Sequence, residues 1–363
     1  MNINSILLSF FMPILCLINS QLMAGYGDCT DSLPSASERE VHVMTNAVRM
    51  DPQGFRDLYI KGADILKAEN YPATTPLWYN NDLSRAARFH SVDMAANCGM
   101  THNSCDGTTF ANRVNSFYKG SKSIAENVAT GRTTGLLTVI QWLRDDDTQG
   151  VPAADKSSDD GHRKNIMNPQ YQEVGCGYGY SATRRYNHFW TQDFGGGKVL
   201  DYYKIPAGCH FTPNSSTLSY AVNYYDATGA APETATVIID GKSYPMELHL
   251  GSMSKGTYIY STTNDGQKHS YYFVFIDGSG SPVRFPQTVN LLTGQQSGCE
   301  SVNVNKIIRS EAGNIRNNHF TQEFFRYRLD GVKVTGKLQQ YYSSGVSVSG
   351  KSKRGQKDIL LKK

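Results

Sequence analysis

The sequence lacks the patterns of several common classes of protein. It contains no CxxC pair, so a zinc ribbon or a thioredoxin-like redox site has little support. Nothing resembles a loop that would cradle a phosphate, and neither Ser104 nor Ser158 lies in a nucleophile-elbow pattern. The uncharged apolar run at residues 6–18 is shorter than the roughly 20 residues that a membrane-spanning helix needs. We therefore expect neither a transmembrane segment nor an obvious covalent catalyst.

The same apolar run is typical of the core of a signal peptide. Small residues at Ser20 and Ala24 offer cleavage positions. We expect residues 1–24 to be removed and the protein to be secreted and extracellular. A buried N-terminal helix is the alternative, and it is disfavoured because the polar, turn-rich stretch after Ala24 offers no packing surface.

Seven cysteines are present, and Cys16 would leave with the signal peptide. The even number that remains predicts a disulfide framework in an oxidising compartment. The remaining cysteines are Cys29, Cys98, Cys105, Cys176, Cys209 and Cys299. Many pairings are possible. We favour Cys98 with Cys105 in a tight loop, Cys209 with Cys299 as a clamp on a second domain, and Cys29 with Cys176 as the remaining pair.

The composition changes twice along the chain, which divides it into three segments. Residues 37–200 mix helical and strand periodicities and predict an α/β sandwich. Its expected helices and strands cover residues 37–59, with a break at Asp51-Pro52, and residues 82–97, 136–143, 173–180 and 188–194. Residues 210–300 contain short β runs separated by Asp-Gly and Gly-Ser turns, which favour an all-β immunoglobulin-like sandwich.

The last segment, residues 301–363, is strongly basic. It contains thirteen Lys and Arg against four Asp and Glu, and it is predicted to be partly disordered. Such a tail could be attracted to a polyanionic surface or could simply raise solubility. We expect no specific nucleic-acid partner. Asn214 begins a glycosylation sequon in the apparent linker between the first two segments.

Five motifs in the first segment occur in a characteristic order. They are CGMTHNSC at 98–105, SIAENVATG at 123–131, VIQWLRDDD at 139–147, DGHRKNIMNPQYQEVGCGYGY at 160–180 and HFWTQDFG at 188–195. In this order they resemble the CAP superfamily of cysteine-rich secretory, antigen 5 and pathogenesis-related 1-type proteins, also called SCP-domain proteins. The GHRKNI form is similar to the bacterial-type members. The resemblance implies an α-β-α sandwich.

The resemblance also implies a cleft with two histidines and two acids. Carried over by motif, these are His102, Glu126, Asp145 and His162, where Asp145 replaces the glutamate of plant and animal members. Glu173 is a weaker candidate for the second acid. Two neutral imidazoles suit a divalent metal such as Zn²⁺, and the carboxylates would orient them. With only His102 and His162 as metal ligands, we expect modest affinity.

Members of this family are mostly extracellular binding proteins, and several are associated with sterols or other lipids. Here the loop between the helix tryptophan and His162 contains six Asp and little apolar surface, so sterol binding through it is disfavoured and a solvated acidic loop is expected. Two functions remain open. The first is a non-enzymatic secreted module that binds a small ligand, peptide or lipid, with no catalytic residues. The second is a metal-dependent or Glu/His general-base hydrolase.

Overall fold

A computed structural model describes residues 24–30, 32–199, 203–294 and 299, and the backbone of 321–327 and 333–339. The chain divides into two compact units, Met1–Ser301 and Val302–Lys363. Except for Ala24, the expected signal peptide lies outside the described residues. No helix in the described part of the chain is long and apolar enough to cross a membrane.

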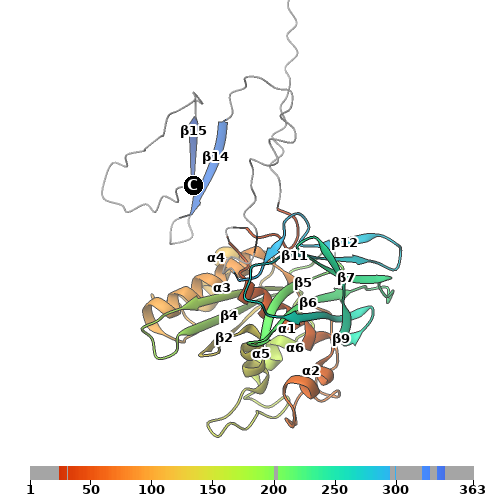
Figure 1. The fold of residues 1–363 in the computed structure, drawn as a ribbon. Coiled ribbons are helices and arrows are strands. Elements are labelled where there is room, and N and C mark those ends of the chain that lie inside the picture. The colour runs from red at the N-terminus through yellow and green to blue at the C-terminus, as the bar shows by residue number, and fades with distance from the viewer. Residues whose placement is uncertain are drawn as a thin grey trace, which may run out of the picture. The chain divides into compact units, whose positions relative to one another are not determined.

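The first unit begins with a mixed sheet of four strands in the order β1-β3-β4-β2 (Figure 1). Strand β1 is parallel to β3, and the other pairs are antiparallel. The strands are β1 (Trp78–Tyr79), β2 (Ile124–Thr130), β3 (Glu173–Tyr180) and β4 (His188–Gly195). The expected α/β sandwich is therefore present, because helices cover both faces of this sheet. The helices of this part of the chain are α1 (Ala36–Met50), α2 (Pro52–Tyr59), α3 (Asn81–Asp93), the π-helical turn Met94–Cys98, α4 (Phe110–Phe117), α5 (Gly135–Arg144) and α6 (Gly161–Met167).

Local sequence explains where the first two helices begin. Ser35 and Glu38 form a reciprocal capping box at the start of α1. Asp51 accepts a hydrogen bond from the Gly54 backbone nitrogen and caps α2, with Pro52 in the first turn. The predicted break at Asp51-Pro52 therefore separates two helices.

Alternating glycines on β3 explain how closely α3 packs on the sheet. A Cβ atom at Gly175, Gly177 or Gly179 would lie only 2.1 to 2.3 Å from the backbone of α3. The intervening residues, including Cys176, point to the opposite face, toward α1. Larger residues at the glycine positions would displace α3, so the GCGYGY pattern reflects close packing between helix and strand.

The second part of this unit is β-rich and consists of two antiparallel sheets. The first has the order β5-β6-β10-β9, and the second has the order β12-β11-β7-β8 with β13 also paired to β11. The strands are β5 (Ala207–Asn214), β6 (Thr217–Tyr225), β7 (Thr234–Ile239), β8 (Lys242–Pro245), β9 (Glu247–Ser252), β10 (Lys255–Thr263), β11 (Ser270–Ile276), β12 (Pro282–Phe285) and β13 (Leu291–Leu292). Their facing sides form one aromatic-rich core that includes Tyr220, Tyr224 and Phe273. Asn214 is exposed in the β5–β6 hairpin turn, not in a linker as expected.

The outer face of the first β-rich sheet packs on α1. Phe211 and Ala221 belong to the same apolar cluster as Met44 and Ala47 of the helix. Helix α1 therefore lies between two sheets, and 13 of its 15 residues are buried. At the edge of this contact, His249 is half-buried and its Nε2 lies 2.8 Å from the Tyr59 hydroxyl.

The disulfides differ from the predicted set. The Cys98–Cys105 pair is present as predicted. Cys29 pairs with Cys299, so the predicted Cys209–Cys299 and Cys29–Cys176 pairs were wrong. Cys176 on β3 and Cys209 on β5 are buried free thiols. Cys176 and Cys209 do not form a disulfide with each other, because α1 lies between β3 and β5.

The second unit is described only as an antiparallel ribbon of β14 (Thr321–Tyr327) and β15 (Lys333–Gln339). These strands fall within the segment predicted to be partly disordered. The rest of that segment lies outside the described residues.

Candidate functional site

The first half of the candidate site joins the Cys98–Cys105 loop to β2. His102 lies in this loop, and its Nδ1 is 2.9 Å from Oε1 of Glu126 on β2. Arg113 of α4 pairs with the other Glu126 oxygen and donates to the His102 carbonyl at 3.0 Å. The Glu126 side chain is 1% exposed whereas that of His102 is 56% exposed. A buried carboxylate therefore orients a solvent-accessible imidazole.

The second half joins the end of α5 to the start of α6. The backbone of Asp145 is left-handed, with φ 45°, a conformation that Asp tolerates better than most residues. One Asp145 oxygen contacts Nδ1 of His162, and the other accepts the His162 backbone N–H at 3.0 Å. The shorter aspartate side chain therefore reaches the second histidine.

Two asparagines connect these halves. Asn127 follows Glu126 on β2, and its amide donates to the His162 carbonyl at 3.3 Å. Asn165 of α6 donates to the Glu126 carbonyl at 3.3 Å and to Asn127 Oδ1 at 2.9 Å. The His102–Glu126 pair is thus held through Glu126, and the His162–Asp145 pair through Asn127, the next residue of the same strand.

The two imidazoles have the same arrangement. Each uses Nδ1 to contact a carboxylate, and neither Nε2 has a hydrogen-bond partner within the described residues. A Nδ1–H donated to a carboxylate fixes the tautomer that leaves a lone pair on Nε2. This donor set fits a borderline metal such as Zn²⁺. No group of three or more His, Cys, Asp or Glu side chains that could hold a metal occurs in the described ranges, so two histidines would be the only side-chain ligands there.

Asp193 is a site residue that the sequence reasoning missed. It lies opposite Glu126 in the β2–β4 register and is fully buried, and neither carboxyl oxygen accepts a hydrogen bond from a described donor. Burial first, and then the charge of Glu126, raise the pKa of Asp193 well above its usual value. The neutral form of Asp193 is therefore favoured beside the Glu126 carboxylate, whose charge Arg113 balances. The sequence feature that could have pointed to Asp193 is an acidic residue inside a strand that is otherwise largely aromatic, HFWTQDF at 188–194.

Other expectations about the site need correction. Glu173 is not the second acid, because its oxygens accept hydrogen bonds from Asn80 at 2.7 Å and Tyr118 at 2.6 Å. His90 is not part of the site, because it is buried with its Nε2 2.7 Å from the Thr101 carbonyl.

The acidic loop before α6 is not simply a solvated face. Asp155 accepts the backbone N–H groups of Leu66 at 2.9 Å and Lys67 at 2.8 Å. Asp160 is fully buried and accepts hydrogen bonds from the Tyr71 hydroxyl and the Lys156 backbone. These two carboxylates therefore attach the loop to the rest of the domain and support the start of α6.

Comparison with known proteins gives one family match. The model of the cysteine-rich secretory protein family, CAP, matches residues 44–194. A Bacillus subtilis (strain 168) protein described as "Uncharacterized protein YkwD" is 30% identical over 168 residues, which cover 46% of this chain. The present chain spans 50% of the length of that relative.

Solved structures with similarity cover part of the chain. An extracellular protein containing an SCP domain from Bacillus anthracis str. Ames is 23% identical, with 41% of this chain and 42% of that chain covered and a TM-score of 0.26. Schistosoma mansoni venom allergen-like protein 4 is 20% identical, with 49% and 95% covered and a TM-score of 0.30. An outer surface protein from Borrelia burgdorferi is 19% identical, with 40% and 94% covered and a TM-score of 0.28.

Proposed function

We propose that this chain, which belongs to the CAP family through residues 44–194, is an extracellular binding protein that holds a divalent metal such as Zn²⁺ between His102 and His162. The observation that carries the proposal is the shared arrangement of the two rings. Each Nδ1 is held by a carboxylate, and each Nε2 lacks a described protein partner. Carboxylate–histidine pairs of this kind orient the ring and raise its basicity as a ligand.

Two protein ligands would leave other metal positions open. Those positions would be filled by solvent or by a group of the ligand, such as a carboxylate of a peptide or small molecule. The protein would then bind its ligand through the metal and through the exposed edges of the cleft. Metal affinity would fall at acidic pH because protonated imidazoles cannot coordinate.

A binding role is favoured over hydrolysis by the state of Ser104, a serine close to His102 in the sequence. Ser104 is buried, and its Oγ accepts a hydrogen bond from Arg113 at 3.1 Å. No described contact joins Ser104 to a histidine side chain that could deprotonate it. A metal-dependent or general-base hydrolase stays the competing outcome of the experiment below.

An extracellular location is supported by two features of the chain. The structure contains the Cys29–Cys299 and Cys98–Cys105 disulfides, and disulfides persist in oxidising compartments. The apolar run at residues 6–18 resembles a signal peptide. Within this proposal, the basic residues of 301–363 would bind a polyanionic surface.

The β-rich region would then be an immunoglobulin-like module. Numbered A, B, C, C′, D, E, F and G from β5 to β12, its strands form the sheets A-B-E-D and G-F-C-C′. The immunoglobulin arrangement places A, B, E and D in one sheet and C, F and G in the other. This agreement of strand order supports the assignment.

Calorimetric titration with Zn²⁺ at neutral pH tests the metal site. The wild-type protein is expected to bind one ion. His102→Ala and His162→Ala should each weaken binding by at least about tenfold, and Glu126→Gln by about tenfold through loss of ring orientation. His269→Ala is the matched control, because both nitrogens of His269 already contact aspartates, at 2.7 and 3.0 Å.

An absence of Zn²⁺ uptake by the wild type, or full uptake by both cleft variants, would remove the metal from the proposal. The same proteins should be assayed against peptide and ester libraries with and without Zn²⁺. Turnover that His102→Ala or His162→Ala abolishes would establish the hydrolase instead.

A further inference from the structure

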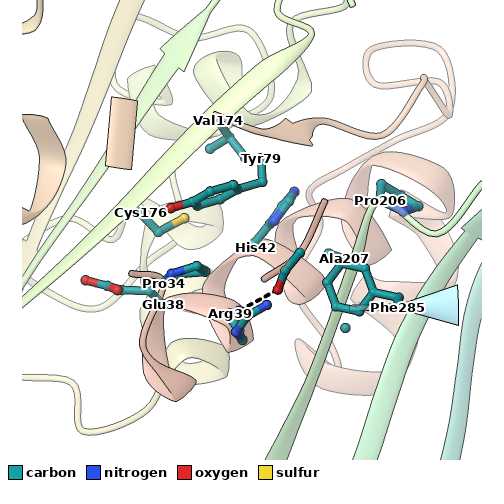
Figure 2. A pocket seen from close by; sticks show the side chains of 12 residues that line it. Pro34, Glu38, Arg39, His42, Tyr79, Val174, Cys176, Pro206, Ala207 and Phe285 are labelled. Carbon is teal, nitrogen blue, oxygen red and sulfur yellow. Dashed lines mark hydrogen bonds between the residues drawn. The ribbon is translucent and has the colours of Figure 1, made fainter. Parts of the chain in front are cut away.

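The pockets between the packed elements leave little room for a second ligand. The pocket lined by Arg39, His42, Tyr79 and Phe285 has a volume of about 10 Å³, which holds no more than one water molecule (Figure 2). A second pocket, between α1 and the first β-rich sheet, is equally small. A further partner would therefore bind on the surface.

The hairpin between β3 and β4 lies at one end of the α/β sandwich. The register places Tyr180, the last residue of β3, opposite His188, the first residue of β4, and β2 ends beside the same hairpin at Thr130. The last turn of α3 also lies here, because a Cβ atom at Gly179 would be 3.0 Å from the Val92 nitrogen. The name hairpin end is used below for residues 92–100, 130–134 and 180–188.

Printed contacts join the three segments of the hairpin end into one surface. Arg184 donates to the Ala96 carbonyl at 3.0 Å, which connects the hairpin to the turn after α3. The Thr130 hydroxyl lies 3.8 Å from the sulfur of Met100, which connects that turn to the end of β2. Side chains that project from these segments therefore face solvent close to one another.

Large apolar side chains are concentrated on the hairpin end. Four of the ten that are exposed in the described part of the chain belong to it. They are Val92 at 50%, Met100 at 59%, Tyr180 at 56% and Tyr186 at 47% exposure. Single exposed apolar residues are ordinary, but a group of them indicates an interaction surface.

The charge of the hairpin end is predominantly positive. Its three segments contain Arg132, Arg184 and Arg185, and Asp93 is their only acidic residue. Arg132 and Arg185 are exposed, and the Arg185 guanidinium lies 5.3 Å from the centre of the Tyr186 ring. Both Asp93 carboxyl oxygens accept hydrogen bonds from neighbouring groups, each at 2.7 Å. Exposed cations and apolar side chains therefore occur together.

We propose that the hairpin end attaches the protein to the surface of an anionic phospholipid bilayer. Val92 and Met100 enter the boundary between headgroups and acyl chains, and the tyrosines lie at headgroup level with their hydroxyl groups hydrated. The arginines pair with lipid phosphates and carboxylates. A soluble polyanion would also pair with the arginines, but it would offer no apolar contact to Val92 and Met100. The attachment is peripheral and is independent of the proposed metal site.

A tryptophan reporter locates the attachment on the molecule. The basic residues of 301–363 can also attract anionic vesicles, so binding of the whole chain alone does not identify the surface. Because Trp78, Trp142 and Trp190 are buried, Tyr186→Trp adds an exposed reporter. Vesicles of phosphatidylcholine and phosphatidylserine should shift its emission to the blue, and brominated lipids should quench it. Met253→Trp is the matched control, because Met253 is 56% exposed in the β9–β10 turn, and it should show neither effect.

Vesicle sedimentation with the full chain measures the contribution of each group. Arg185→Gln should weaken binding to vesicles with about 30% phosphatidylserine by about fivefold. Tyr180→Ser with Tyr186→Ser should weaken it by at least about tenfold, through lost apolar burial. Met253→Ser and Arg144→Gln should bind like the wild type, because Met253 lies in the β-rich region and Arg144 pairs with Asp146.

Three results would overturn the proposal. They are an unchanged spectrum of Tyr186→Trp, an equal response of Met253→Trp, and unaltered vesicle binding by both hairpin-end variants. Equal wild-type affinity for vesicles of phosphatidylcholine alone would remove the role of the arginines and also refute it. If the double serine variant fails to fold, the comparison of the two tryptophan reporters decides.

Discussion

The two disulfides should contribute very different amounts to stability. Cys29–Cys299 has a sequence separation of 270, whereas Cys98–Cys105 has a separation of 7. A disulfide lowers the entropy of the unfolded chain by an amount that increases with the logarithm of the number of residues in the loop that it closes. By this chain-entropy relation, the long loop is worth about 5.5 kcal/mol and the short loop about 2.5 kcal/mol at 25 °C. We therefore expect Cys29→Ser with Cys299→Ser to cost roughly twice as much as Cys98→Ser with Cys105→Ser.

The long-loop variant should still fold, because other bonds hold the N-terminal segment. The Asp28 carboxylate accepts the backbone N–H groups of Thr288 at 3.0 Å and Val289 at 3.3 Å. The Gln287 backbone nitrogen also donates to the Tyr26 carbonyl at 3.0 Å. The loss should therefore appear as a lower free energy of unfolding and not as failure to fold.

Urea unfolding followed by tryptophan fluorescence measures this loss, because Trp78, Trp142 and Trp190 are all buried. Alkylation of the unfolded, unreduced wild type is the control, and it should label only Cys176 and Cys209 among the cysteines of the described residues. Equal losses in the two double variants, or a larger loss for the short loop, would refute the reasoning.

Two further predictions concern ionisable groups. Asp193→Asn should preserve the fold, because the amide is close in size to the carboxyl group and places no charge beside Glu126. It should also remove the infrared carbonyl band expected of a carboxylic acid whose neutral form is favoured. The raised pKa of Asp193 makes the wild type lose stability as pH rises above about 4. Above that pH, the unfolding free energy of Asp193→Asn should therefore increase relative to that of the wild type. A difference between the two proteins that does not change with pH would contradict this account. Lys204→Met should destabilise the β-rich region at neutral pH, because Lys204 pairs with Asp226 at 2.9 Å and Asp277 at 2.7 Å. Burial alone would raise the pKa of Asp226, but the hydrogen bond from Lys204 lowers it, and a second hydrogen bond from Lys204 lowers the pKa of Asp277. The wild type therefore loses this stabilisation as pH falls below about 4, and the difference in unfolding free energy between it and Lys204→Met should shrink there.

Much of the α/β sandwich and the site could be read from local sequence. The Asp51-Pro52 pair marks a helix break because proline fits the first turn of a helix and aspartate caps it. Cys98 and Cys105 could be paired correctly because their sequence separation is only 7, which keeps them close in space. His102 and His162 were identified from motifs, and the structure places them in contact with Glu126 and Asp145, respectively.

Relations between distant residues could not be read in this way. Asp193 meets Glu126 only because the register of β2 and β4 places them opposite each other. The partner of Cys29 was missed because the N-terminal segment packs against residues 287–289 at the far end of the chain, a contact that cysteine spacing does not contain.

Sequence alone therefore determined the helix boundary at Asp51-Pro52 and marked His102 and His162 as candidate site residues, since each depends on neighbouring residues. The tertiary structure decided what covers α1. Arg39 is polar, yet it is buried because the N-terminal segment and Phe285 of the β-rich region cover it, whereas Asn46 is buried where its amide bonds to the Leu77 backbone. Periodicity shows which faces of an element are apolar, but the partner of each face depends on packing between segments far apart in the chain.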